Sequence, residues 1–187
     1  MTIRASALAE PNELQAALAD DAAFEAWYRR TLPRVYSYVM SRCGSDRDVA
    51  EELTQLTFIA AVEQRWRFDA RSDSVTWLCG IARHKLADHY RALERAERRQ
   101  MRMEVRQIEL EREARTQPGL ADQAVIEEAF RSLPAAQRAM LAFVAQDGLS
   151  VAEAGRLLGK STGAAQSLLH RARESFRRAY RGELLHD

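Results

Sequence analysis

Apolar side chains recur at helical spacing along most of the chain, and this feature constrains the fold more than any other. Only eight Gly and four Pro interrupt the 187 residues, so signals for turns are few. Charged residues make up 29% and aromatic residues 7%, a composition that favours helices over strands. We therefore predict an all-α fold.

The predicted helices fall into two groups, one on each side of a highly charged segment. Pro33 is expected to kink or break the first helix, and Gly44 to stop it in a left-handed conformation. Ser45 or Asp46 is expected to cap the second helix. The expected ranges are 24–42, 48–63, 75 to about 91, 125–133, 135–146, 151–158 and 162–178.

Arginine and glutamate alternate between residues 92 and 116, before Gln117-Pro118-Gly119 breaks the pattern. This is typical of a charged linker with helical tendency. We therefore expect two small helical domains joined by this linker, the C-terminal one with a helix-turn-helix. The expected divisions are an N-terminal tail at 1–22, a domain at 23–92, the linker at 93–122 and a second domain at 123–187.

Charge and composition bound the function. The formal net charge is only +1, so nucleic-acid binding has to be sought segment by segment. No apolar run reaches the roughly 18 residues that span a bilayer, and we expect a cytoplasmic protein. Cys43 and Cys79 form no CxxC pair and are expected to remain thiols. No catalytic or metal-ligand constellation is visible, so we expect no enzyme, metal, cofactor or small-molecule substrate.

The segment around Ser150 predicts two short helices joined by a tight turn. Ser150 and Glu153 form a capping box, so a helix begins there. This helix ends at Gly159, and Ser161 caps the next one. Gly155 and Gly159 are expected where the two helices cross and need small residues. The spacing of caps and turn predicts a helix-turn-helix.

The second of these helices has an apolar face and a basic face. Ala165, Leu169, Ala172 and Phe176 form the predicted buried stripe. From Arg156 to Arg181 basic residues outnumber acidic ones by about six. Such a face suits the DNA major groove, and a merely solvated face is the other interpretation. The expected DNA contacts are Lys160, Ser161, Thr162, Gln166, Ser167, His170, Arg171 and Arg173.

Residues 155–162, GRLLGKST, also look like a phosphate-binding loop. However, three residues separate the two glycines where the motif needs four, and a helix precedes the loop where the motif needs a strand. We therefore reject nucleotide binding.

Three segments resemble one family, the extracytoplasmic-function (ECF) sigma factors of the sigma-70 family. Residues 133–173, LPAAQRAMLAFVAQDGLSVAEAGRLLGKSTGAAQSLLHRAR, are similar to its minus-thirty-five-binding domain. AEELTQLTF at 50–58 resembles its core-polymerase-binding helix, and TWLCGIARHKLADHYR at 76–91 resembles its minus-ten-reading helix. The resemblance implies a sigma factor that binds core RNA polymerase and directs promoter-specific transcription initiation.

The resemblance assigns the helix at 48–63 to core polymerase. Its acidic and polar face is expected to meet the β′ clamp helices, where charge complementarity sets register and encounter rate. The C-terminal domain is expected to meet the β flap. Leu56 stands where the family usually has an acid. The expected contacts are Glu51, Glu52, Gln55 and Phe58.

The resemblance assigns minus-ten reading to the following loop and helix. Trp66 and Phe68 are expected to stack on a flipped base, at roughly 1–3 kcal/mol per base. Trp77, Ile81 and Leu86 are expected in the core. The other expected minus-ten contacts are Arg65, Arg67, Arg71, Arg83, His84, Lys85 and Arg91.

Several positions depart from the family pattern. Val75 and Gly80 replace residues that are commonly basic, and Cys79 replaces a common aromatic, so promoter melting is expected to be weaker or its base preference unusual. Gln166 and Leu168 replace residues that are commonly Lys and Arg, and Leu168 is expected to pack inward. Fewer phosphate contacts predict a shallower salt dependence.

The resemblance also implies promoter DNA and an anti-sigma factor as partners. Two alternatives remain open. A helix-turn-helix regulator would bind duplex DNA without core polymerase, which a gel shift with and without core would reveal. A structural or adaptor protein would bind another protein through the Glu51–Ile59 surface and leave promoter choice unchanged.

Overall fold

The computed structural model describes residues 13–17, 20–68, 73–104 and 122–184, and all regular elements among these residues are helical. This confirms the predicted all-α fold. None of the described helices combines the length and the apolar character needed to cross a membrane. The elements are α1 (Glu13–Ala17), α2 (Asp21–Met40), α3 (Arg47–Glu63), the 3₁₀ turn η1 (Arg65–Arg67), α4 (Ser74–Glu104), α5 (Asp122–Arg131), α6 (Ala135–Leu141), the π turn η2 (Ala142–Gln146), α7 (Val151–Leu157) and α8 (Thr162–Leu184).

Short polar caps set where α2 and α3 begin. The Asp20 carboxylate accepts the Ala23 N–H at 2.9 Å, and the Asp46 carboxylate accepts the Val49 N–H at 3.1 Å. Asp46 is therefore the cap that α3 uses. Gly44 follows α2 with a φ of +74°, which confirms the expected left-handed stop.

α2 continues through Pro33, so of the expected kink or break the helix does not have the break. Proline removes one helical hydrogen bond. Pro33 itself faces solvent, but Trp27 and Thr31 before it and Val35 and Val39 after it are buried. Packing on both sides of Pro33 offsets the missing hydrogen bond and keeps the helix in one piece.

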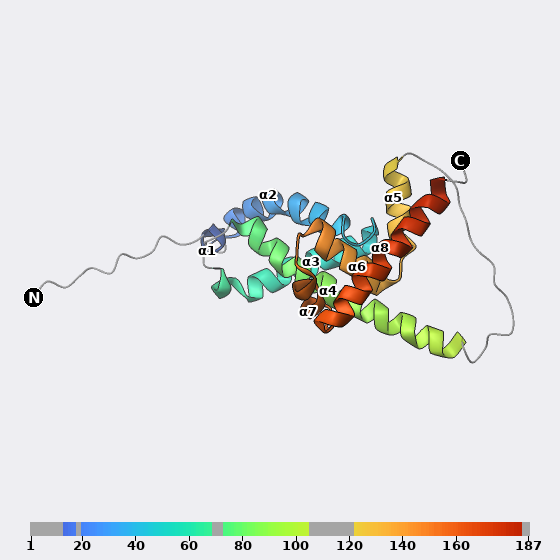
Figure 1. The fold of residues 1–187 in the computed structure, drawn as a ribbon. Coiled ribbons are helices and arrows are strands. Elements are labelled where there is room, and N and C mark those ends of the chain that lie inside the picture. The colour runs from blue at the N-terminus through green and yellow to red at the C-terminus, as the bar shows by residue number, and fades with distance from the viewer. Residues whose placement is uncertain (1–12, 18–19, 69–72, 105–121, 185–187) are drawn as a thin grey trace, which may run out of the picture.

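Two elements differ in length from the prediction. α4 runs to Glu104, well into the expected linker, and its 31 residues measure about 46 Å at 1.5 Å per residue. Its last turns project beyond the other helices (Figure 1). The helix expected over 135–146 is α-helical only to Leu141 and then widens into η2, where the Asp147 N–H donates to the Ala142 carbonyl at 3.1 Å.

Two apolar clusters hold the helices together. The first surrounds Trp27, Phe58 and Leu78 in the N-terminal helices. The second joins the two groups of helices, because Leu86 and Tyr90 of α4 pack in it with residues of α6, η2, α7 and α8. α6 accordingly packs against α4, and α8 packs against both α6 and α7 (Figure 1). The C-terminal members of the second cluster are Ala135, Ala136, Ala139, Met140, Phe143, Ala154, Leu158, Ala165, Leu168 and Leu169.

Candidate polymerase and nucleic-acid interfaces

An acidic and polar ridge lies on the exposed face of α3. Glu51, Glu52 and Gln55 are all exposed, as predicted. Leu56 and Ile59 follow Glu52 and Gln55 by one helical turn, and they are 37% and 54% exposed. Ile59 was not among the predicted contacts. Exposed apolar area within a charged surface is typical of a protein-docking site.

Phe58 does not belong to this ridge. Its side chain is only 5% exposed, and its ring packs edge-on against Trp27 and Tyr28, with centroids 5.6 and 4.7 Å apart. Phe58 therefore stabilises the core, and the predicted surface contact is wrong. A hollow of about 350 Å³ opens beside the ridge, between α2 and α3. It is lined by Tyr28, Leu32, Pro33, Tyr36, Glu51, Thr54 and Gln55.

The two aromatic residues predicted to stack on a flipped base, Trp66 and Phe68, differ in their exposure to solvent. Trp66, on η1, is 69% exposed. Phe68 is 4% exposed and packs against Trp77 with ring centroids 5.2 Å apart. A base has access to Trp66 but not to Phe68, so the predicted contact at Phe68 is wrong. Arg65 and Arg67 are exposed on either side of Trp66.

α4 carries the other predicted minus-ten residues. Asp73 caps its first turn, accepting the backbone N–H groups of Val75 and Thr76 at 3.0 and 3.1 Å. The Thr76 hydroxyl also donates to Asp73, and these hydrogen bonds lower the pKa of that carboxyl. Arg71 lies outside the described residues. The predicted side chains on α4 are exposed or half-buried: Arg83, His84, Lys85 and Arg91.

The helix-turn-helix of α7 and α8 carries the predicted capping box. The Ser150 hydroxyl accepts the Glu153 N–H at 3.3 Å, and the Glu153 carboxylate accepts the Ser150 N–H at 2.9 Å. A Cβ on Gly155 would lie 2.8 Å from the Cβ of Ala165, so the helix crossing requires glycine there. Gly159 has open space around it and a φ of +64°. Its role is therefore to provide the turn conformation, which corrects the crossing role predicted for it.

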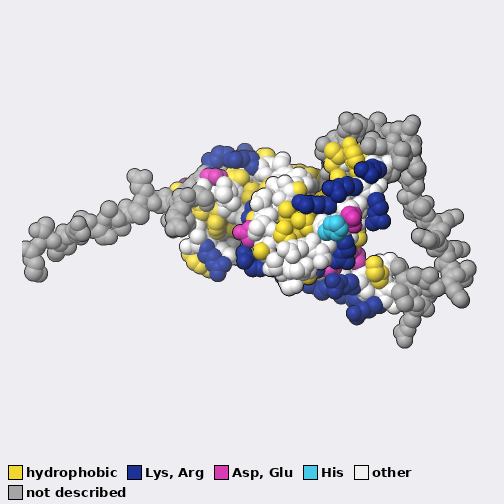
Figure 2. Space-filling model, viewed as in Figure 1, with side chains coloured by type: hydrophobic (Ala, Val, Ile, Leu, Met, Phe, Trp, Pro, Cys, Tyr) yellow, Lys and Arg dark blue, Asp and Glu magenta, His cyan; other side chains and the backbone are white. Residues whose placement is uncertain are grey.

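α8 has the predicted buried stripe and exposed face. Ala165, Leu169 and Ala172 are buried, Phe176 is half-buried, and Leu168 also packs inward at 5% exposure. Basic side chains spread over α8 and the adjoining part of α4 (Figure 2). The predicted DNA contacts that are exposed on this face and in the turn before it are Ser161, Thr162, Gln166, Ser167, His170, Arg171 and Arg173.

Two predicted DNA contacts are engaged by acids that lie far away in the sequence. The Lys160 ammonium lies 2.8 and 3.0 Å from the two carboxylate oxygens of Glu94 on α4. The Arg83 Nε donates to the Asp147 carboxylate at 3.1 Å. Partial burial by itself would raise the pKa of Glu94, but Lys160 and Arg98 outweigh this effect and lower the pKa.

Asp147 is a further residue near the candidate interfaces that sequence reasoning missed. Its side chain is 1% exposed, and it accepts hydrogen bonds from the Tyr38 hydroxyl, from Arg42 Nε at 2.7 Å and from Arg83 Nε. Burial, together with the charge of Asp147, raises the pKa of Tyr38 to about 12, so the hydroxyl remains a donor. These partners lie 64 to 109 residues away in the sequence, and no local pattern signals them.

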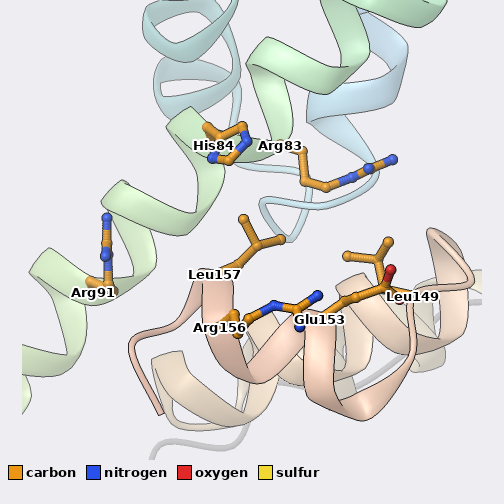
Figure 3. A pocket seen from close by; sticks show the side chains of 7 residues that line it. All are labelled: Arg83, His84, Arg91, Leu149, Glu153, Arg156 and Leu157. Carbon is orange, nitrogen blue, oxygen red and sulfur yellow. The ribbon is translucent and has the colours of Figure 1, made fainter. Parts of the chain in front are cut away.

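A hollow of about 470 Å³ opens near this contact, between α4 and α7 (Figure 3). It places predicted minus-ten residues opposite the first helix of the helix-turn-helix. Arg83, His84 and Arg91 come from α4, and Leu149, Glu153, Arg156 and Leu157 come from α7 and the turn before it.

The two cysteines are free thiols. Cys43 is buried, and desolvation raises its pKa to about 11, while Cys79 is half-buried and its pKa is raised for the same reason. Within the described ranges, no cluster of three His, Cys, Asp or Glu side chains is suited to a metal ion.

The fold and its exposed basic face define a DNA-binding protein of the helix-turn-helix class. Residues 27–96 match Sigma-70 region 2, and residues 123–176 match Sigma-70, region 4. The chain belongs to the family of ECF RNA polymerase sigma factors. It therefore acts with core RNA polymerase in promoter-specific transcription initiation, and its relatives are transcription factors rather than enzymes.

Curated relatives match most of the chain. It is 34% identical to ECF RNA polymerase sigma factor SigF of Caulobacter vibrioides over 74% of this chain and 75% of that protein. It is 36% identical to ECF RNA polymerase sigma factor SigC of Mycobacterium tuberculosis over 87% of this chain and 85% of that protein. The sigma factor RpoE of Bartonella quintana, solved in complex with the anti-sigma factor NepR, matches 84% of this chain and 96% of that chain. With a TM-score of 0.50 and 23% identity, it shows a shared fold.

Proposed function

We propose that the two groups of helices divide the work of a sigma factor. Residues 23–92 would bind core polymerase and read the minus-ten element, residues 123–187 would read the minus-thirty-five element, and residues 93–122 would connect them. The separate matches to region 2 and region 4 support this division. The observation that carries the proposal is the capped helix-turn-helix with its exposed polar and basic face on α8.

The α3 ridge is the proposed docking surface for core polymerase. Glu51 and Glu52 supply charge that can steer the encounter with a basic partner. Leu56 and Ile59 supply the apolar area that a stable contact buries. We leave Phe58 out of this surface because it is buried.

Trp66 is the proposed stacking platform for an unpaired minus-ten base, because it is the exposed aromatic residue of η1. Arg65 and Arg67 on either side are exposed and are the proposed phosphate contacts. Arg171 and the other exposed side chains of α8 are the proposed minus-thirty-five contacts. Side chains in the first turns of such a helix reach base edges in the major groove.

We also infer an anti-sigma factor as a regulatory partner. RpoE, which shares the fold, was solved bound to the anti-sigma factor NepR. A partner that covered the α3 ridge or the α8 face would block the proposed contacts with polymerase or promoter. The proposed activity places the protein with core polymerase and the chromosome, in the cytoplasm.

Run-off transcription with purified core polymerase and a library of promoter fragments tests these assignments. Arg171→Ala should reduce promoter-specific transcripts about fivefold or more, because one DNA contact contributes roughly 1–3 kcal/mol. Glu52→Ala should weaken core binding in a pull-down. Arg131→Ala and Glu25→Ala remove exposed charges from α5 and α2 and serve as matched controls. Tight promoter binding by free protein, with no effect of core on initiation, would overturn the proposal.

A further inference from the structure

We propose that the hollow of about 350 Å³ between α2 and α3 is a binding site for a small organic cation, an ammonium or amidinium group on a flat apolar body. The site goes beyond the sigma-factor function, which needs no small ligand. A bound cation would also cover part of the α3 ridge. This second step rests on the proposed docking of core polymerase on that ridge.

The α2 side of the hollow is suited to a flat apolar body. α2 and α3 lie side by side, and the volume of the hollow falls within the roughly 300–1,000 Å³ that is typical of ligand pockets (Figure 1). Tyr28, Leu32 and Tyr36 are spaced one helical turn apart and are half-buried. The Tyr28 ring is held in place by Phe58, with ring centroids 4.7 Å apart. Aromatic rings pack well on flat molecules, and their faces attract cations.

The charge at the hollow is negative. Of the described residues that line it, only Glu51 carries a charge. Glu51 is exposed, and within the described part of the chain it forms no ion pair, so its carboxylate is open to a ligand. An amidinium or guanidinium group matches a carboxylate with two parallel hydrogen bonds. Charge complementarity therefore favours a cation and disfavours an anion.

Thr54 adds a polar group whose hydrogen bonding is incomplete. Its side chain is 2% exposed, and its hydroxyl has no hydrogen-bond partner among the described residues. The buried Thr57 of the same helix, by contrast, donates to the Leu53 carbonyl at 2.7 Å. A buried hydroxyl without a partner is unfavourable, so a ligand that donates to Thr54 gains a bond that the free protein lacks. Pro33 on the facing helix has no N–H and offers no such donor.

The hollow and the α3 ridge share two residues. Glu51 and Gln55 line the hollow and are also exposed on the ridge. A cation bound to Glu51 would neutralise one of the charges that are proposed to meet core polymerase, and its body would occupy the edge of the same surface. The ligand and core polymerase should therefore compete.

The test uses three probes of nearly the same size and shape: benzamidine is a cation, benzamide is neutral and benzoate is an anion. Binding to the full-length protein, without core, is followed by nuclear magnetic resonance of the backbone amides. Benzamidine should saturate with a dissociation constant of about 0.1–1 mM, as expected for so small a ligand. It should shift the signals of residues 28–36 and 51–55. Benzamide should bind at least about tenfold more weakly because it lacks the charge.

Substitutions locate the site. Glu51→Gln should weaken benzamidine binding about fivefold, whereas Glu63→Gln, which removes another exposed acid of α3 away from the hollow, should match wild type. Thr54→Val keeps the size of the side chain and removes the unpartnered hydroxyl. It should raise the Tm and yet weaken benzamidine binding about threefold, a combination that a purely structural role would not give.

The site is refuted if benzamidine does not saturate, if benzamide or benzoate binds equally well, or if Glu51→Gln binds benzamidine as wild type does. A pull-down then tests competition, since saturating benzamidine should reduce the capture of core polymerase and benzamide should not. Unchanged capture would rule out competition. Failure of the wild-type protein to capture core without any probe would instead refute the proposed function, and the binding data would still decide the site.

Discussion

Replacing Gly155 with alanine probes the tight crossing of α7 and α8. The new Cβ would lie 2.8 Å from the Cβ of Ala165 and 3.4 Å from the carbonyl oxygen of Lys160. Ala165 is fully buried and short, so it cannot swing aside. Overpacking of this kind costs about 2–3 kcal/mol, near the upper end of its usual range. Alanine's better helix propensity returns up to about 1 kcal/mol.

The net loss of about 1–2 kcal/mol should lower the Tm by roughly 2–8 °C in a protein of this size. Thermal unfolding followed by far-ultraviolet circular dichroism measures this shift. Gly80→Ala is the matched control, because the Cβ added in α4 meets no atom within 4 Å. It should leave the Tm unchanged or raise it by a few degrees, as the better helix former.

The double variant Gly155→Ala with Ala165→Gly removes the crowded pair of Cβ atoms. Its loss of stability should be smaller than the sum of the two single losses, because the second substitution relieves the contact made by the first. If Gly155→Ala melts at or above the wild-type temperature, the reasoning about the crossing is refuted.

Three further predictions concern the surface, the thiols and the contact between α4 and the helix-turn-helix. Trp66→Ala should reduce promoter opening about fivefold or more because it removes the proposed stacking contact, and it should change the Tm little because Trp66 is 69% exposed. Permanganate footprinting with core polymerase measures promoter opening. Unchanged opening would rule out Trp66 as the stacking platform. Cys43 should be alkylated at least about a hundredfold more slowly at pH 8 in native than in denatured protein, because its pKa is raised to about 11 and little reactive thiolate is present. Peptide mass spectrometry measures the two rates. Comparable rates would contradict the burial of Cys43. The pKa of Glu94 is lower in the folded protein than in the unfolded chain, so its pairing with Lys160 stabilises the fold. This stabilisation is complete at a pH above the ordinary glutamate pKa. It is lost as the pH falls through the pKa that Glu94 has in the folded protein. Between about pH 5 and pH 3, urea unfolding should therefore show a larger loss for wild type than for Glu94→Gln, and parallel losses would contradict the pairing.

Features set by neighbours in sequence could be predicted. The Asp46 cap, the capping box of Ser150 and Glu153 and the inward position of Leu168 all depend on residues within one or two helical turns. The same holds for most of the helical ranges, with the exceptions of the end of α4 and the helix expected over 135–146, and for the exposure of the α3 ridge.

Features that depend on residues far away in the sequence could not be predicted. The periodicity marks Phe58 and Phe68 as aromatic positions, but only tertiary packing buries them against Trp27 and Trp77. The buried contacts of Asp147 come from residues far away in the chain. The difference between Gly155 and Gly159 likewise depends on which backbone passes close by.

The cluster shared by α4 and the C-terminal helices has a consequence during synthesis. Leu86 and Tyr90 leave the ribosome well before Leu169, the last residue of the cluster that covers them. At about 5–20 residues per second, the intervening stretch of about 80 residues takes roughly 4–16 s to make. During those seconds the apolar face around Leu86 and Tyr90 is exposed on the nascent chain. Folding of the protein during synthesis should therefore depend on holdase chaperones more than its small size suggests.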